Sequence, residues 1–98
     1  EISRVSISQQ GKTYFVKGQL FFASTESFID YFKTVQNDEQ SSIVIDFSLC
    51  KVWDDSAIGA LMKVKDQLKA KNIEVTYLNI DESSKQLLKK LTGTTLID

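Results

Sequence analysis

The chain of 98 residues contains no histidine and no proline, and Cys50 is its only cysteine. Without an imidazole, serine and cysteine nucleophiles lack their usual base, and zinc sites built from cysteine and histidine are excluded. A single cysteine also excludes an internal disulfide. We therefore expect a domain that is not an enzyme and that holds neither a metal nor a cofactor.

The chain has almost no excess of charge of either sign, and it has no long apolar run. The 12 basic and 13 acidic residues give a net charge of -1, so no strong field attracts nucleic acid. The apolar runs, such as LFFA at residues 20–23, are far shorter than the ~20 residues that span a bilayer. The sequence predicts a soluble piece of protein with no nucleic-acid partner.

The hydrophobic pattern predicts strands that alternate with helices around one modest core. Residues 2–7 and 13–17 read as a hairpin, and Ser24 is a plausible N-cap for a helix that ends near residue 36. Further along, the pattern predicts a strand at 42–47 covered on both faces, a helix to about residue 70, a strand at 73–77, a helix from about residue 82 and a short strand at 94–97. This order indicates an α/β fold with a mixed, mostly parallel sheet, an N-terminal hairpin and helices packed against the sheet.

Three loops, at residues 18–24, 48–56 and 79–83, follow parallel strands and should gather at one edge of the sheet. We expect Asp54 or Asp55 to cap the following helix, which is the simplest role for these carboxylates. Together with Asp46 they are also candidate Mg²⁺ ligands, although no glycine-rich phosphate loop accompanies them.

Aromatic side chains stand beside the same carboxylates. Phe21, Phe22 and Trp53 are candidate docking residues, since exposed aromatic groups mark interaction sites. Because aromatic side chains are usually buried, we also expect Phe21 or Phe22 to lie in the core. Ser56 lies in the first turn of a predicted helix, where a phosphate would meet free backbone N–H groups but also the neighbouring carboxylates.

Two motifs resemble a known family. The strand at 43–47 followed by DDSAIG at 54–59 is similar to the signature of STAS domains, which occur in sulfate transporters and in anti-sigma factor antagonists. The antagonists carry Asp-Ser-Ser-Gly-Leu-Gly there, and a partner kinase phosphorylates the second serine. Ser56 occupies that position, whereas Asp55 and Ala57 replace the first serine and the glycine.

The second motif, GQLFFAS at 18–24, resembles a segment of the C-terminal STAS domains of SulP-type anion permeases. The resemblance implies that residues 1–98 are a single STAS domain cut from the C-terminus of a larger transporter of sulfate or a related anion. It further implies a non-catalytic regulatory role at the cytoplasmic face of the membrane. The expected partners are the transmembrane domain of the same transporter, which is expected to be a homodimer, and a soluble regulatory protein.

Two alternatives come from other functional classes. The chain could be a free-standing anti-sigma factor antagonist that is switched by phosphorylation of Ser56. A small nucleotide-binding or nucleotide-hydrolysing domain is supported only by the geometry of the sheet edge and by analogy between folds.

Overall fold

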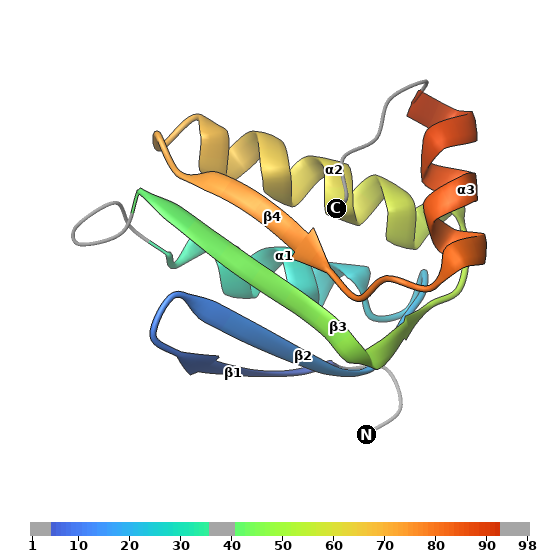
Figure 1. The fold of residues 1–98 in the computed structure, drawn as a ribbon, viewed down its shortest axis with the longest axis horizontal. Helices are drawn as coiled ribbons and strands as arrows, with labels where there is room; N and C mark the ends of the chain where they lie inside the picture. Colours follow the sequence, from blue (N-terminus) through green and yellow to red (C-terminus); the bar gives the residue numbers. More distant parts are fainter. Residues whose placement is uncertain (1–4, 36–40, 93–98) are drawn as a thin grey trace.

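The structure is a computed structural model that describes residues 5–35 and 41–92. Four strands and three helices follow one another in the predicted order (Figure 1). Their bounds are β1 Ser6–Gln10, β2 Thr13–Leu20, α1 Thr25–Lys33, β3 Ser42–Val52, α2 Asp55–Lys69, β4 Glu74–Leu78 and α3 Glu82–Thr92. The predicted strand at 94–97 lies outside the described residues.

The strands form one sheet in the order β1-β2-β3-β4. β1 and β2 make an antiparallel hairpin whose turn contains Gly11 at a φ of 64°, a backbone conformation that favours glycine. β2 and β3 are parallel, as are β3 and β4. The predicted mixed, mostly parallel sheet is therefore confirmed.

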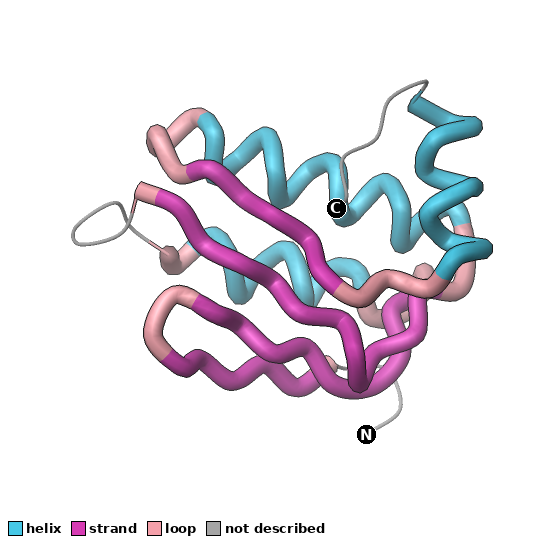
Figure 2. The backbone as a smooth tube through the Cα atoms, viewed as in Figure 1, coloured by secondary structure: helices cyan, strands magenta, loops and turns pink. Residues whose placement is uncertain are grey.

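Helices α1 and α2 lie together behind the sheet in the view of Figure 2 and cover one of its faces. Strand residues at every second position point into this layer, and those from β3 are Ile43, Ile45 and Phe47. They meet Phe28 and Phe32 of α1 and a set of α2 residues that includes Ile58, Leu61, Val64 and Leu68. This layer is the hydrophobic core.

The other face of β3 is not covered by a helix of the described residues, which corrects the expectation of a strand buried on both sides. Val44 and Asp46 face that side and are partly exposed, and so are Thr76 and Leu78 on β4. The apolar residues at 43–47 suggested burial on both faces, but the polar residue among them, Asp46, lies on the outward face.

β2 and β3 both continue beyond their predicted ends, at residues 17 and 47. Phe15 pairs with Asp46 but Lys17 pairs with Leu49, so β3 contains one extra residue between these pairs. Such a bulge breaks the alternation by which a strand is recognised in a sequence. As a result, the loops before α1 and α2 are only residues 21–24 and 53–54, shorter than predicted.

None of the helices in residues 5–35 and 41–92 is long and apolar enough to cross a bilayer.

Candidate functional site

The loops after β2, β3 and β4 lie at the same end of the sheet, as expected for parallel strands that lead into helices (Figure 2). We call this end the carboxyl edge; it comprises residues 18–24, 48–56 and 79–84. It contains all the candidate interaction residues and the candidate phosphorylation position. The loops differ in sequence, but in each of them a short polar side chain forms hydrogen bonds with backbone groups and holds the loop in place.

Ser24 fixes the loop between β2 and α1. It occupies the N-cap position of α1, but its fully buried hydroxyl does not cap the helix. Instead, the hydroxyl accepts a hydrogen bond from the Phe21 N–H at 3.1 Å and donates one to the Gln19 carbonyl at 2.8 Å. The serine therefore closes a tight turn, and this turn leaves Phe22 at its tip.

Phe21 and Phe22 differ in burial. Phe21 is half-buried, whereas Phe22 is 71% exposed, and the two rings meet edge to face with centroids 5.4 Å apart. The expectation that one of them belongs to the core is wrong, because the Ser24 turn directs the pair away from it. Only the half-burial of Phe21 agrees in part with the expectation.

Asp54 has two structural roles. Its Oδ1 accepts a hydrogen bond from the Ala57 N–H at 3.0 Å and caps α2, which selects Asp54 over Asp55 as the predicted cap. Its Oδ2 accepts a second hydrogen bond from the Phe22 N–H at 3.1 Å. The carboxylate thus joins the loop after β2 to the loop after β3 and holds Phe22 in place.

Asp81 plays the equivalent role before α3. It accepts hydrogen bonds from the Ser84 N–H at 3.3 Å and from the Ser84 hydroxyl at 2.7 Å. That hydroxyl is buried and also lies 3.1 Å from the carbonyl of Val52, at the end of β3. Burial would raise the pKa of Asp81, but the hydrogen bonds from Ser83 and Ser84 outweigh it and lower the pKa below its ordinary value.

Asp46 marks the bulge of β3. Its Oδ1 accepts a hydrogen bond from the Ser48 N–H at 2.7 Å, and its Oδ2 accepts one from Asn79 Nδ2 at 2.9 Å. Asn79 has a φ of 62°, a conformation that asparagine tolerates better than most residues. Burial would raise the pKa of Asp46, but these hydrogen bonds lower it overall. Asp46 and Asp54 thus serve separate loops, and the described residues contain no cluster of metal-ligating side chains.

Three large apolar side chains are exposed along the carboxyl edge. They are Phe22, Trp53, which is 53% exposed, and Leu49, which is 63% exposed. The Lys51 ammonium lies 4.5 Å from the centroid of the Trp53 ring. Leu49 is not among the predicted site residues, because the bulge that turns it outward cannot be recognised in the hydrophobic pattern.

Asp55 and Ser56 both lie exposed in the first turn of α2, beside the Asp54 cap. The structure thus brings Asp54, Asp55 and Ser56 together and joins them to Phe22 through Asp54.

Cys50, expected in a loop, lies in β3 and is half-buried, and burial raises the pKa of its thiol to about 11. A thiol with this pKa remains neutral at physiological pH.

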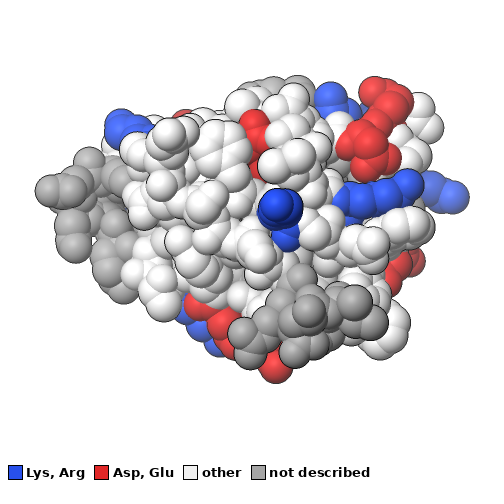
Figure 3. All heavy atoms as spheres, turned by 90° about the horizontal axis from the view of Figure 1, so that it is seen from below, with Lys and Arg blue, Asp and Glu red and all other residues white. Residues whose placement is uncertain are grey.

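Figure 3 shows one face of the molecule, seen from below the view of Figure 1. Basic and acidic side chains stand there among wide uncharged areas, and neither sign covers the face. On this face, a partner would be recognised by local contacts rather than by a long-range field of one sign.

Comparison with known families decides the identity of the fold. The STAS domain family matches residues 4–96, which is nearly the whole chain. The chain belongs to the STAS domain family. The DDSAIG segment that suggested this family forms the first turns of α2, and GQLFFAS forms the end of β2 and the Ser24 turn.

The chain also matches a relative in Bacillus subtilis (strain 168). The chain is 36% identical over 83 residues to YbaR, a protein named as a candidate sulfate transporter. The alignment covers 85% of this chain but only 17% of that protein. The STAS domain thus spans about a sixth of the length of the curated relative that it matches.

Solved structures agree with the fold. The STAS domain of an anti-sigma factor antagonist from Rhodobacter sphaeroides superposes with a TM-score of 0.56 at 29% identity, covering 74% of this chain and 82% of the other. An anti-sigma factor antagonist from Mycobacterium paratuberculosis superposes with a TM-score of 0.60 at 15% identity, covering 95% and 82%. The second likeness concerns the fold alone.

Proposed function

We propose that this STAS domain is the C-terminal cytoplasmic regulatory domain of a SulP-type transporter of sulfate or a related anion. In this proposal the domain is non-catalytic, the parent protein is a homodimer in the membrane, and the carboxyl edge docks against the membrane domain of the same transporter. The identity to YbaR supports the transporter assignment. A soluble regulatory protein is a further partner that the same edge would suit.

The observation that carries the docking proposal is the exposure of Phe22 and Trp53 on loops that are held rigid. Large apolar side chains that face water gain free energy when a partner covers them, at about 25 cal/mol per Å² of apolar surface. Because Asp54 holds the Phe22 loop through a hydrogen bond, little conformational entropy is lost when the edge binds. The edge is thus preorganised for contact.

The test uses the full-length transporter in membrane vesicles. Phe22→Ser combined with Trp53→Ser should change the rate of anion uptake at equal surface expression, because both side chains would leave the interface. Met62→Ser is the matched control, since Met62 is also an exposed apolar residue, at 37%, but lies along α2 away from the loops. Uptake that is unchanged in the double variant would reject docking through this edge.

A second test concerns the carboxylates Asp54 and Asp55, which are replaced by residues of nearly the same shape. Asp54→Asn with Asp55→Asn removes two charges, and the one oxygen of asparagine can keep the cap of α2, so the domain should stay folded; the bond to the Phe22 N–H is lost. Uptake that is also altered by Asp55→Asn alone, which leaves both hydrogen bonds of Asp54 in place, would support a charged contact. Glu74→Gln with Asp66→Asn, two exposed carboxylates away from the edge, controls for net charge.

A second candidate function is supported by the position of Ser56. Its exposure in the first turn of α2 suits modification, and the relative from Rhodobacter sphaeroides is an anti-sigma factor antagonist. A free-standing antagonist should incorporate one phosphate from its cognate serine kinase, and Ser56→Ala should abolish this incorporation. Failure to incorporate phosphate, together with a native polypeptide found in membranes, would exclude this function.

A further inference from the structure

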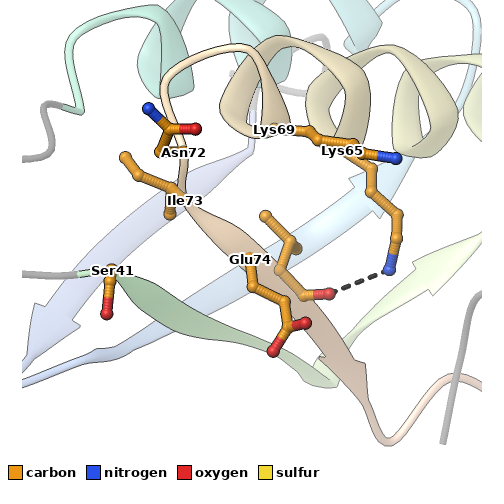
Figure 4. Close-up of a pocket in the computed structure, with 7 residues that line it drawn as sticks. Ser41, Lys65, Lys69, Asn72, Ile73 and Glu74 are labelled. Carbon is orange, nitrogen blue, oxygen red and sulfur yellow. Dashed lines mark hydrogen bonds between the residues drawn. The ribbon is translucent and has the colours of Figure 1, made fainter.

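Within residues 5–35 and 41–92, one open hollow lies at each end of the sheet. The first lies beside β4 and the second half of α2, has a volume of about 360 Å³ and is shown in Figure 4. Lys65 reaches across it and donates a hydrogen bond to the Val75 carbonyl at 2.9 Å. That ammonium protects a backbone group of the outermost strand, so it serves the fold and is not free for a ligand.

The second hollow, of about 490 Å³, lies at the carboxyl edge, beside the end of β3. This volume falls within the range of small-molecule sites. Its lining comes from the ends of β2 and β3 and from the loop after β4, and includes Gln19, Leu49, Lys51, Trp53, Asn79 and Asp81. Segments far apart in the sequence therefore converge on it.

The polar groups of this hollow are not all engaged with the protein. Asp81 is held by Ser83 and Ser84, and Asn79 donates to Asp46. The Lys51 ammonium, in contrast, makes no ion pair or hydrogen bond with the described residues and lies over the Trp53 ring. Gln19 pairs with Lys51 in the ladder, so both side chains leave the same face of the sheet from backbones about 5 Å apart.

We propose that this hollow binds a small organic monoanion with an apolar body of about the size of one ring. The Lys51 ammonium and the Gln19 amide N–H would hold the anionic group, while Leu49 and the exposed part of Trp53 would contact the apolar body. Asp46 and Asp81 lie close by, and their charges disfavour a ligand with several negative charges, such as a nucleoside triphosphate. The inference does not depend on the proposed transporter function.

The single tryptophan supplies a direct readout, because its indole N–H gives one signal in a ¹H–¹⁵N spectrum. The domain would be titrated with sodium benzoate at constant ionic strength, and in parallel with benzyl alcohol and with sodium sulfate. We expect benzoate to shift the Trp53 signal with saturation in the millimolar range, because the hollow is open to solvent. Equal shifts from benzyl alcohol or from sulfate, or no shift from benzoate, would overturn the proposal.

Lys51→Gln should weaken benzoate binding roughly two- to tenfold and leave the response to benzyl alcohol unchanged. Lys63→Gln is the matched control, because Lys63 is an exposed lysine of α2 outside the hollow, and benzoate binding should be unaffected. Leu49→Ser tests the apolar wall separately and should weaken binding without changing the other signals. Unchanged benzoate affinity in the Lys51→Gln protein would reject the assignment.

Discussion

At the end of the sheet opposite the carboxyl edge, lysine ammonium groups bond backbone carbonyls. Lys71 donates to the carbonyls of Lys33 and Val35 at 2.7 and 2.8 Å, and Lys65 donates to Val75. At the carboxyl edge, Lys51 lies over Trp53 and bonds no carbonyl of the described residues. The same side chain thus closes helix and strand ends in one region and remains available for a ligand in the other.

At the carboxyl edge, most of the carboxylates are engaged in hydrogen bonds within the protein. Asp46, Asp54 and Asp81 each accept hydrogen bonds from backbone or side-chain donors, whereas Asp55 is exposed in the first turn of α2. Loops at binding sites are useful when a rigid scaffold positions them. Here the acidic residues provide the rigidity, while the exposed aromatic and basic side chains remain available for contact.

The largest expected effect concerns the cap that holds the edge together. Asp54→Ala should lower the free energy of unfolding by about 1–2 kcal/mol, since it removes the cap of α2 and leaves the Phe22 N–H unpaired. Urea denaturation followed by circular dichroism measures this loss. Asp54→Asn keeps one acceptor oxygen, so it should retain the cap of α2, lose the bond to the Phe22 N–H and cost less stability than Asp54→Ala. Equal losses in the two variants would show that the cap of α2 contributes little.

The order of the elements was predictable from the sequence, but their ends at the carboxyl edge were not. The alternating pattern at 73–77 and the helical pattern along α2 can be recognised in the sequence, because one side of each element packs against the core throughout its length. In β3 the bulge shifts the alternation, so that Phe47 is buried but Leu49 is exposed. A local backbone irregularity of this kind depends on the partner strand and is not encoded in composition.

Only part of the candidate site could be predicted from the sequence. The capping position before α2 follows from local chemistry, and the structure confirms Asp54 there. Ser24 has the same local signature, yet its hydroxyl bonds Phe21 and Gln19, because the tight turn competes for it. The roles of Phe22, Trp53, Asp55 and Ser56 in binding stay predictions.

At the opposite end, Lys71→Met should lower the free energy of unfolding by about 1 kcal/mol, because two carbonyls near the end of α1 lose the ammonium that they bond. Lys69→Met is the control, since Lys69 is exposed and makes no hydrogen bond to the described residues; its effect should stay within about 0.5 kcal/mol. Equal effects in the two variants would remove the structural role assigned to Lys71.

Gly59→Ala should instead stabilise the domain, by about 0.5–1 kcal/mol, because alanine favours the helix and the added Cβ meets no atom within 4 Å. Gly11→Ala gives the opposite sign, since Gly11 has a φ of 64°. Thermal unfolding measures both. If Gly59→Ala stabilises the domain but alters anion uptake by the full-length protein that we propose, a partner must approach this exposed side of α2 closely.

The smallest effect concerns pH. The lowered pKa values of Asp46 and Asp81 mean that each carboxylate adds stability above its unfolded pKa, near 3.8, and that this stability is lost as the pH falls through the lower folded pKa. The domain should therefore lose more stability between neutral and strongly acidic pH than a variant with Asp46→Asn and Asp81→Asn. Urea denaturation at both pH values measures the difference, which is small because both groups are partly open to solvent. Identical losses in the two proteins would mean that these carboxylates are not held more tightly than ordinary surface groups, and the edge would owe its rigidity to Ser24 and Asp54 instead.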